Sequence, residues 1–366
     1  MMSNNTESYS DNKSLMVSYK KFTIKKILFI AICIILAFIA LGLSICIGAA
    51  DISFKEVYEI IYKHIIGTTY QKGTVEFIHD YIIWNIRLPR ALFALIAGAG
   101  LAVGGAVMQS VMKNPLADPY TTGISSGTCF GVAIALVLGL TVSNSQIGNL
   151  GLVMNAFIFA LIPTALIIII TFKNSTSPAT LILAGVAISY IFNALTTVLL
   201  ISTDAETLAI VYRWQVGSLT EVTWNSIPLM ATINIAGIII TIFISKKLNI
   251  MALGDENAKS LGINSGNMRI ISLMIISFMV ASVISYVGII GFIGLISAHI
   301  VRILIDSDNR FVIPASAAFG AVFLIGADII SKYLSPTDSI PVGVVISFIG
   351  APVFLYLIIR QKRNIW

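Results

Sequence analysis

Charged residues are scarce in this sequence of 366 residues, and that scarcity limits the class of protein. Asp, Glu, Lys and Arg make up 11% of the chain, hydrophobic residues make up 57%, and the mean hydropathy is +0.94. Soluble domains contain about 25% charged residues. Too few polar side chains are present to cover a water-exposed globule, so lipid must surround much of the chain. This composition excludes a soluble enzyme, a nucleic-acid-binding protein and a disordered scaffold.

Motifs for nucleotide, metal or covalent chemistry are also missing. No segment matches the phosphate-binding pattern G-x-x-x-x-G-K-[ST], and no His, Cys and Asp residues have the spacing of a metal site or a catalytic triad. The cysteines Cys33, Cys46 and Cys129 lie in apolar runs, which favours buried thiols over a disulfide framework. We therefore expect no catalytic residue, no metal site and no bound cofactor. Active transport would need energy from a partner subunit or an ion gradient.

Long apolar runs occupy most of the chain. A bilayer-spanning helix needs about 20 apolar residues, and ten runs approach this length. They cover residues 27–47, 91–111, 122–140, 150–172, 181–201, 227–244, 270–289, 291–305, 312–330 and 342–359. The second run contains Gly98, Gly100, Gly104 and Gly105, and such small residues let helices approach closely. These runs predict an all-α integral membrane protein with about ten tightly packed transmembrane helices.

The basic residues indicate how these helices are oriented. If the amino terminus is inside, 16 of the 23 Lys and Arg residues fall on the inner side and 7 on the outer side. Cytoplasmic loops of membrane proteins contain such an excess of Lys and Arg. The even number of spans places both termini in the cytoplasm, so the net charge of +6 reflects topology rather than nucleic-acid binding. We predict a disordered cytoplasmic tail over residues 1–22 and a transmembrane domain over residues 23–366.

Three polar interruptions of the apolar pattern carry a family resemblance. The first contains Arg87, Pro89 and Arg90, followed by Gln109 and by Lys113, Asn114, Pro115, Leu116, Ala117, Asp118 and Pro119. The second contains Leu253, Gly254, Asp255, Glu256, Ala258, Leu261 and Gly262. The third contains Gly288, Gly291, Gly294, His299, Arg302, Asp328, Pro341, Gly343, Gly350 and Pro352. In order and spacing they resemble the FecCD-type permeases of ABC importers for iron–siderophore, haem and cobalamin.

The resemblance assigns roles at the two membrane faces. It implies that Arg87, Arg90 and Lys332 dock an external substrate-binding protein, although interfacial snorkelling of long basic side chains is an alternative. Lysine lacks the planar fork of arginine, so Lys332 would make the weaker contact. The resemblance also implies that Asn114 and Leu116 close the cytoplasmic mouth of the pathway. A simple inner turn, caused by the two prolines, is the alternative.

The loop over residues 246–269 contains the third group of candidates. Leu253, Ala258 and Leu261 form an incomplete apolar stripe on a short polar helix, and glycines are placed to end that helix. The family resemblance makes it the coupling helix of the permease, with Gly254, Asp255, Glu256, Leu261 and Gly262 contacting the ATP-hydrolysing subunit. A solvated loop lying on its own protein is the alternative.

Two polar residues inside the apolar runs are expected to be structural. His299 is the only histidine in a run, and a lone histidine there is more often a hydrogen-bonding residue than a metal ligand. Asp328 lies four residues before Lys332, which permits an ion pair on one helix face. A single intramembrane acid provides no proton relay, which disfavours an ion-coupled transporter.

The resemblance implies an ABC type II importer permease fold with two inverted helix groups. It implies a transport subunit without enzymatic activity, located in a bacterial or archaeal cell membrane. Its partners would be two ATPase subunits that bind the ATP, an extracytoplasmic binding protein, and a second copy of the chain or a homologous permease. We expect uptake of an iron–siderophore complex by alternating access. Uptake of haem or cobalamin is the alternative, and ion-coupled secondary transport is a more distant one.

Overall fold

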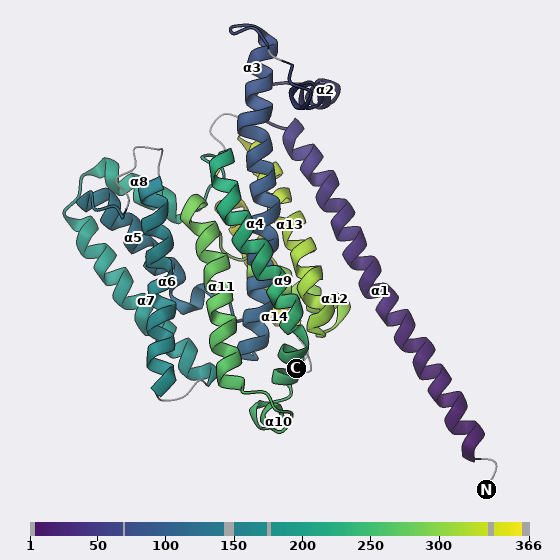
Figure 1. The fold of residues 1–366 in the computed structure, drawn as a ribbon. Coiled ribbons are helices and arrows are strands. Elements are labelled where there is room, and N and C mark those ends of the chain that lie inside the picture. The colour runs from purple at the N-terminus through teal and green to yellow at the C-terminus, as the bar shows by residue number, and fades with distance from the viewer. Residues whose placement is uncertain (1–3, 69, 143–149, 174–176, 336–339, 361–366) are drawn as a thin grey trace.

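The computed structural model describes residues 4–68, 70–142, 150–173, 177–335 and 340–360 (Figure 1). Within these ranges the regular elements are all helices, and no strand occurs. Ten of the helices correspond one to one to the predicted spans, which confirms the all-α membrane fold. They are α1 (Asn4–Cys46), α4 (Leu88–Met112), α5 (Ile124–Leu138), α6 (Leu150–Lys173), α7 (Pro178–Ile201), α9 (Ile227–Ala252), α11 (Ser265–Val287), α12 (Ile293–Ile305), α13 (Asn309–Leu334) and α14 (Val342–Arg360).

The helices differ in their ability to cross a bilayer alone. Seven of the described helical segments are long and apolar enough to do so, and α5, α12 and the described part of α14 are shorter apolar helices. The run that contains α12 is itself short and begins with Gly291, so the helix that fills it is short as well. The peripheral helices expose large apolar side chains such as Phe38, Tyr190 and Phe243. In a bilayer these faces contact lipid.

The first described residues of the chain belong to a helix. Helix α1 begins at Asn4 and so runs through residues 4–22 of the segment 1–22, whose assignment as a disordered tail stays a prediction. The first glycine of the chain is Gly42 and the first proline is Pro89, so no strong helix breaker separates the polar start from the apolar span. The helix runs along the outside of the bundle, and its amino-terminal part extends beyond the other helices (Figure 1).

Helix α4 lies at the centre of the bundle and packs against α9, α11, α12 and α13. Most of its residues are buried. At Gly98 a side chain would collide with the backbone of Gly320 in α13, and at Gly105 with the backbone of Gly294 in α12. These glycines therefore allow backbones to touch, as the small residues of the second run predicted.

A π-helical turn joins α4 to the helix before it. Helix α3 (Val75–Tyr81) continues through the π-helix η1 (Ile82–Arg87) into α4, with Pro89 in the first turn of α4. Proline removes a backbone donor and clashes with the preceding turn, and a widened turn accommodates both effects. The indole of Trp224 donates a hydrogen bond to the Trp84 carbonyl in this turn, with a distance of 2.8 Å between Nε1 and O.

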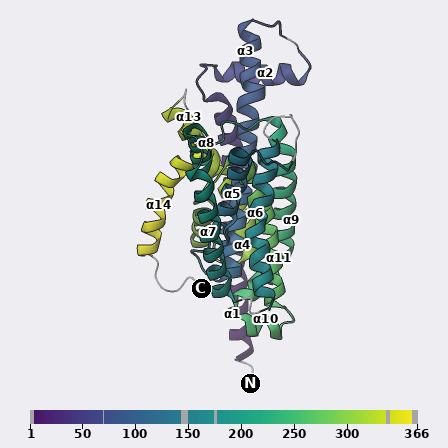
Figure 2. The same ribbon diagram turned by 90° about the vertical axis from the view of Figure 1, so that its left-hand side faces the viewer.

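The short helices mark the two ends of the bundle. Helices α2 (Phe54–Ile65) and α3 lie at one end, and α10 (Asp255–Ser260) lies at the other (Figures 1 and 2). These are called the α2–α3 end and the α10 end below. The remaining elements are η2 (Pro119–Thr122), α8 (Ala205–Gln215) and η3 (Trp224–Ser226).

Candidate functional site

Arg87 caps the end of α1. Its Nη1 donates to the carbonyl oxygens of Ile45 and Cys46 at 3.1 and 2.8 Å, and its Nη2 donates to that of Ala50 at 2.5 Å. The last carbonyls of a helix lack partners within the helix. The buried guanidinium therefore supplies hydrogen bonds to these carbonyls and joins the end of α1 to the start of α4.

Arg90, Asp328 and Lys332 form one buried ionic cluster. The Nε of Arg90 donates to Oδ1 of Asp328 at 2.7 Å, and Nζ of Lys332 lies 2.8 Å from Oδ2 of the same carboxylate. Lys332 also donates to the carbonyl and hydroxyl oxygens of Ser44, at 3.1 and 2.9 Å. The predicted pair between Asp328 and Lys332 is thus confirmed. The cluster joins α1, α4 and α13 at the α2–α3 end.

The three basic residues predicted to dock a binding protein meet at one recess. Arg87, Arg90 and Lys332 all line a cavity of about 300 Å³ at the α2–α3 end, beside residues 47–50 and Thr220. Their side chains are nevertheless buried and hydrogen-bonded within their own chain. They therefore hold the helices around the recess together, and their contact with a binding protein stays a prediction.

The predicted cytoplasmic gate is a compact turn after α4. Lys113 ends the helix in the left-handed conformation, with φ of 50°. The side-chain oxygen of Asn114 then accepts a hydrogen bond from the backbone N–H of Leu116 at 2.9 Å. The Leu116 side chain remains exposed. Asn114 thus stabilises the turn that presents Leu116 at the α10 end, and closure of a pathway by these residues stays a prediction.

The connection predicted at residues 246–269 is shorter in the structure. Helix α9 extends to Ala252 and α11 begins at Ser265, so α10 and its flanking turns fill only residues 253–264. Gly254 and Gly262 flank α10 with φ of 110° and 78°, and residues other than glycine rarely adopt such positive values. Both glycines therefore set the turns that orient α10, which agrees with their predicted place at the ends of this helix.

Asp255 connects α10 to the bundle through two cations. Arg269 donates from Nη1 to Oδ2 at 2.9 Å and from Nη2 to Oδ1 at 2.7 Å, and Lys113 donates to Oδ1 at 2.8 Å. Arg269 also donates from Nε to the Val111 carbonyl. The hydrogen bonds from Arg269 lower the pKa of Asp255 to about 2. This Asp255–Arg269–Lys113 network links α10 to α4 and α11, a role that the sequence did not assign to Asp255.

The apolar residues around α10 point in different directions. Ala258 is fully buried, whereas Leu253 and Leu261 are 61% and 59% exposed. The stripe predicted from the sequence is therefore divided, with one residue packed inward and two leucines facing outward. Glu256 is also exposed. Leu253, Glu256 and Leu261 are thus accessible to a partner at the α10 end.

A second polar network joins three helices inside the bundle. Arg302 of α12 donates from Nε to Gln109 at 3.3 Å and from Nη2 to the Ser110 hydroxyl at 2.7 Å and to Asn309 at 3.1 Å. Gln109 in turn donates to the Leu295 carbonyl. Gln109 and Arg302 belong to separate sequence motifs, and the sequence did not predict their contact. Each is a polar residue inside an apolar run, and such residues need a polar partner when they are buried. They connect α4, α12 and α13.

Metal ligands are not grouped in the described part of the chain. Among the described residues, no group of three or more His, Cys, Asp or Glu side chains could hold a metal ion. His299 is buried in α12. Cys33, Cys46 and Cys129 are free and buried.

Comparison with known proteins identifies the family. The model of the FecCD transport family matches residues 27–360. A Methanocaldococcus jannaschii protein whose name describes an ABC transporter permease is 37% identical, covering 95% of this chain and 98% of its own length. The iron(3+)-hydroxamate import system permease protein of Bacillus subtilis is 33% identical, covering 88% of this chain and 80% of its own. The hemin transport system permease protein of Yersinia pestis is 32% identical, covering 90% and 95%.

One solved structure agrees with this family assignment. The structure of a transporter described as metal-chelate type, in an inward-facing conformation, superimposes with a TM-score of 0.77 and 27% sequence identity. The match covers 92% of this chain and 100% of that chain. The chain therefore belongs to the FecCD transport family, and it is a multi-pass ABC transporter permease.

Proposed function

We propose that this chain is the membrane-spanning subunit of an ATP-driven importer for an iron–siderophore complex. The family match over residues 27–360 carries the proposal. Relatives that cover most of the chain are named for import of iron(3+)-hydroxamate and iron(3+)-citrate. Haem and cobalamin are the alternative substrates, because permeases for these also match.

The two ends of the bundle would meet different partners. The outward-facing leucines beside α10 suit a groove of an ATPase subunit, because an exposed apolar pair favours burial against a partner. The recess lined by Arg87, Arg90 and Lys332 lies at the opposite end, where a substrate-binding protein would dock. With the α10 end in the cytoplasm, both termini are cytoplasmic, in agreement with the excess of basic residues on that side.

Transport would proceed by alternating access at an interface with a second permease. ATP binding and hydrolysis on the partner subunits would move α10, and the Asp255–Arg269–Lys113 network would pass this movement to α4 and α11. The turn with Asn114 and Leu116 follows α4 directly and would open or close the α10 end. The chain itself makes and breaks no covalent bond in this scheme.

Inhibitors distinguish the proposed energy source from an ion gradient. Cells that express this chain with its partner subunits should accumulate a radiolabelled ferric siderophore, and vanadate should abolish uptake whereas an uncoupler should not. Excess unlabelled haem or cobalamin should leave the uptake unchanged. Uptake that stops with the uncoupler alone would identify a secondary transporter, and competition by haem or cobalamin would identify the alternative substrate.

Leu261→Asp should uncouple ATP hydrolysis from uptake. The substitution places a charge on an exposed leucine that would enter the ATPase groove, so it weakens this contact without disturbing the core. Uptake by proteoliposomes containing the assembled transporter should fall severalfold, and the amount of inserted protein should stay normal. Leu140→Asp is the matched control, since Leu140 is 62% exposed and follows α5 rather than α10. Normal uptake by the Leu261 variant would reject α10 as the coupling helix.

A further inference from the structure

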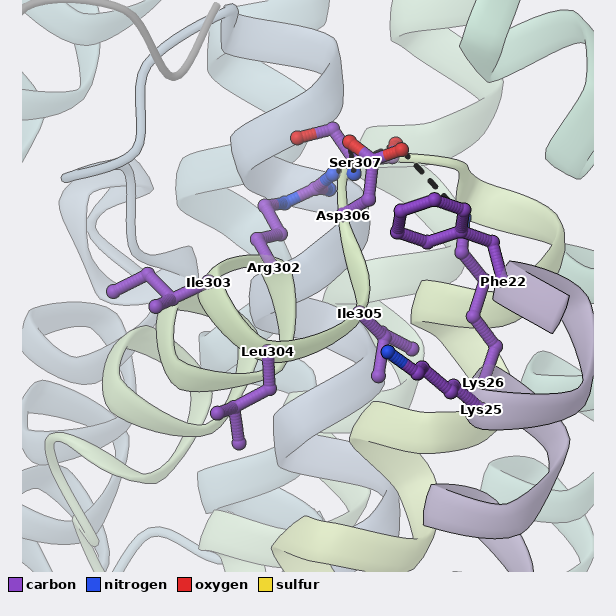
Figure 3. Close-up of a pocket in the computed structure, with 9 residues that line it drawn as sticks. All are labelled: Phe22, Lys25, Lys26, Arg302, Ile303, Leu304, Ile305, Asp306 and Ser307. Carbon is purple, nitrogen blue, oxygen red and sulfur yellow. Dashed lines mark hydrogen bonds and ion pairs between the residues drawn. The ribbon is translucent and has the colours of Figure 1, made fainter. Parts of the chain in front are cut away.

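A pocket separates the start of the apolar part of α1 from the end of α12. Its volume is about 550 Å³, and it lies near the α10 end of the bundle, because Asp308, which follows the lining residue Ser307, accepts a hydrogen bond from Asn249 near the end of α9. It is lined by Phe22, Lys25 and Lys26 of α1, by Arg302, Ile303, Leu304 and Ile305 of α12, and by Asp306 and Ser307. Figure 3 shows the α1 side chains on one side of the pocket and the α12 side chains on the other.

Positive charge predominates in this pocket. Lys25 is exposed, and its Nζ lies 5.7 Å from the centre of the Phe22 ring. Lys26 is largely buried and pairs with the exposed Asp306 at 3.6 Å between Nζ and Oδ2. Arg302 adds a buried positive charge behind them, although its guanidinium donates to Gln109, Ser110 and Asn309. Asp306 is the only acidic residue among the lining residues.

The edge of the pocket is apolar and faces outward. Phe22, Ile303 and Leu304 are exposed, and they continue into the exposed Ile27 and Leu28 of α1. Both α1 and α12 are apolar helices of the bundle, so their outward faces contact acyl chains. A ligand of this pocket must therefore be anionic at one end and apolar at the other.

We infer that this pocket binds an anionic phospholipid. Lys25 and Lys26 contact the phosphate, and the acyl chains lie along Ile303 and Leu304. Basic pockets between transmembrane helices on the cytoplasmic side have this chemistry. A bound lipid would also fill the space between α1 and α12, which otherwise touch only slightly. Free phosphate would leave the apolar edge uncovered, and α10, where the ATPase subunit is proposed to bind, lies apart from α1 in Figure 1.

Lipid titration of the purified full-length chain tests this inference. In a neutral detergent, native mass spectrometry should show that dioleoylphosphatidylglycerol binds at least about tenfold more tightly than dioleoylphosphatidylcholine. Lys25→Gln with Lys26→Gln should remove most of this preference. The matched control is Lys246→Gln with Lys247→Gln. These two exposed lysines lie near the carboxyl-terminal end of α9, which is also at the α10 end of the bundle. This control should keep the preference.

A variant that gains affinity separates binding from misfolding. Asp306→Asn removes the carboxylate that competes for Lys26, and asparagine has nearly the same size and shape as aspartate. Phosphatidylglycerol should bind this variant more tightly than the unmodified chain. Equal binding of the two lipids, equal losses in the two lysine pairs, or displacement of the lipid by inorganic phosphate at equal concentration would each overturn the inference.

Discussion

Asp255→Asn is expected to reduce substrate uptake about tenfold while ATP hydrolysis by the assembled transporter continues. The amide keeps the shape of the carboxylate but loses the negative charge that Arg269 and Lys113 share. Arg269 is fully buried, so a weakened bidentate contact costs about 1–3 kcal/mol. About 1.4 kcal/mol corresponds to a factor of ten in an equilibrium. The link between α10 and α4 should therefore loosen while the outward face of α10 stays intact.

Parallel variants locate the cause of this effect. Lys113→Gln should reduce uptake less, because Lys113 makes a single and more exposed contact with Asp255. Glu206→Gln should leave uptake unchanged, since that exposed carboxylate of α8 lies outside the network. The measurements are uptake and ATP hydrolysis in proteoliposomes, with co-purification of the ATPase subunit. Unchanged uptake by Asp255→Asn, or loss of the ATPase subunit from the complex, would contradict the transmitting role of Asp255.

The same network should be insensitive to pH in the neutral range. Hydrogen bonds from Arg269 lower the pKa of Asp255 to about 2, so the carboxylate is charged throughout the neutral range. A lowered pKa in the folded state stabilises the network above the ordinary pKa of aspartate, and this contribution disappears only as the pH falls towards 2. The ratio of uptake to ATP hydrolysis should consequently show no titration of Asp255 between about pH 5 and pH 8.

The transmembrane helices were predictable because each is marked by a continuous run of apolar residues in its own segment of the sequence. A run of apolar residues identifies a span without knowledge of its neighbours, and even the short α12 was found in this way. The start of α1 at Asn4 is harder to predict, because its first residues are polar and show no hydrophobic period, although no glycine or proline separates them from the apolar span. The π-helical turn before Pro89 was also missed, since its geometry depends on how the helix continues on both sides.

The sites were less predictable because their partners are distant in the sequence. The pair of Asp328 and Lys332 could be read from their spacing on one helix face. The contact of Asp328 with Arg90 spans 238 positions, and the contacts of Arg87 with the end of α1 span about 40. Asp255 was predicted to contact a partner protein, which stays a prediction, and its contact with Arg269, 14 positions later, was not predicted. Charge alone gives no indication whether a residue faces a partner or its own chain.

Asp328→Asn should destabilise the protein more than either Arg90→Met or Lys332→Met. Asp328 is fully buried and contacts both cations, so its neutralisation leaves two buried positive charges facing an uncharged amide. Removal of one partner from a buried ion pair costs about 3–5 kcal/mol. Each methionine variant instead keeps one cation paired with Asp328 and fills the same space. The yield of folded protein in detergent and its thermal unfolding temperature should rank the variants in this order.

The Lys332→Met variant also separates the structural role of the cluster from docking. If Lys332 acts only by bonding Asp328 and Ser44, this variant should fold and should bind the substrate-binding protein with normal affinity. If the lysine contacts that protein as well, the variant should fold normally but bind several times more weakly, with a smaller dependence on salt. Equal destabilisation by all three variants would show that Asp328 is not the centre of the cluster. The asymmetry arises because one carboxylate contacts two cations, so its neutralisation weakens two ion pairs whereas each methionine variant weakens one.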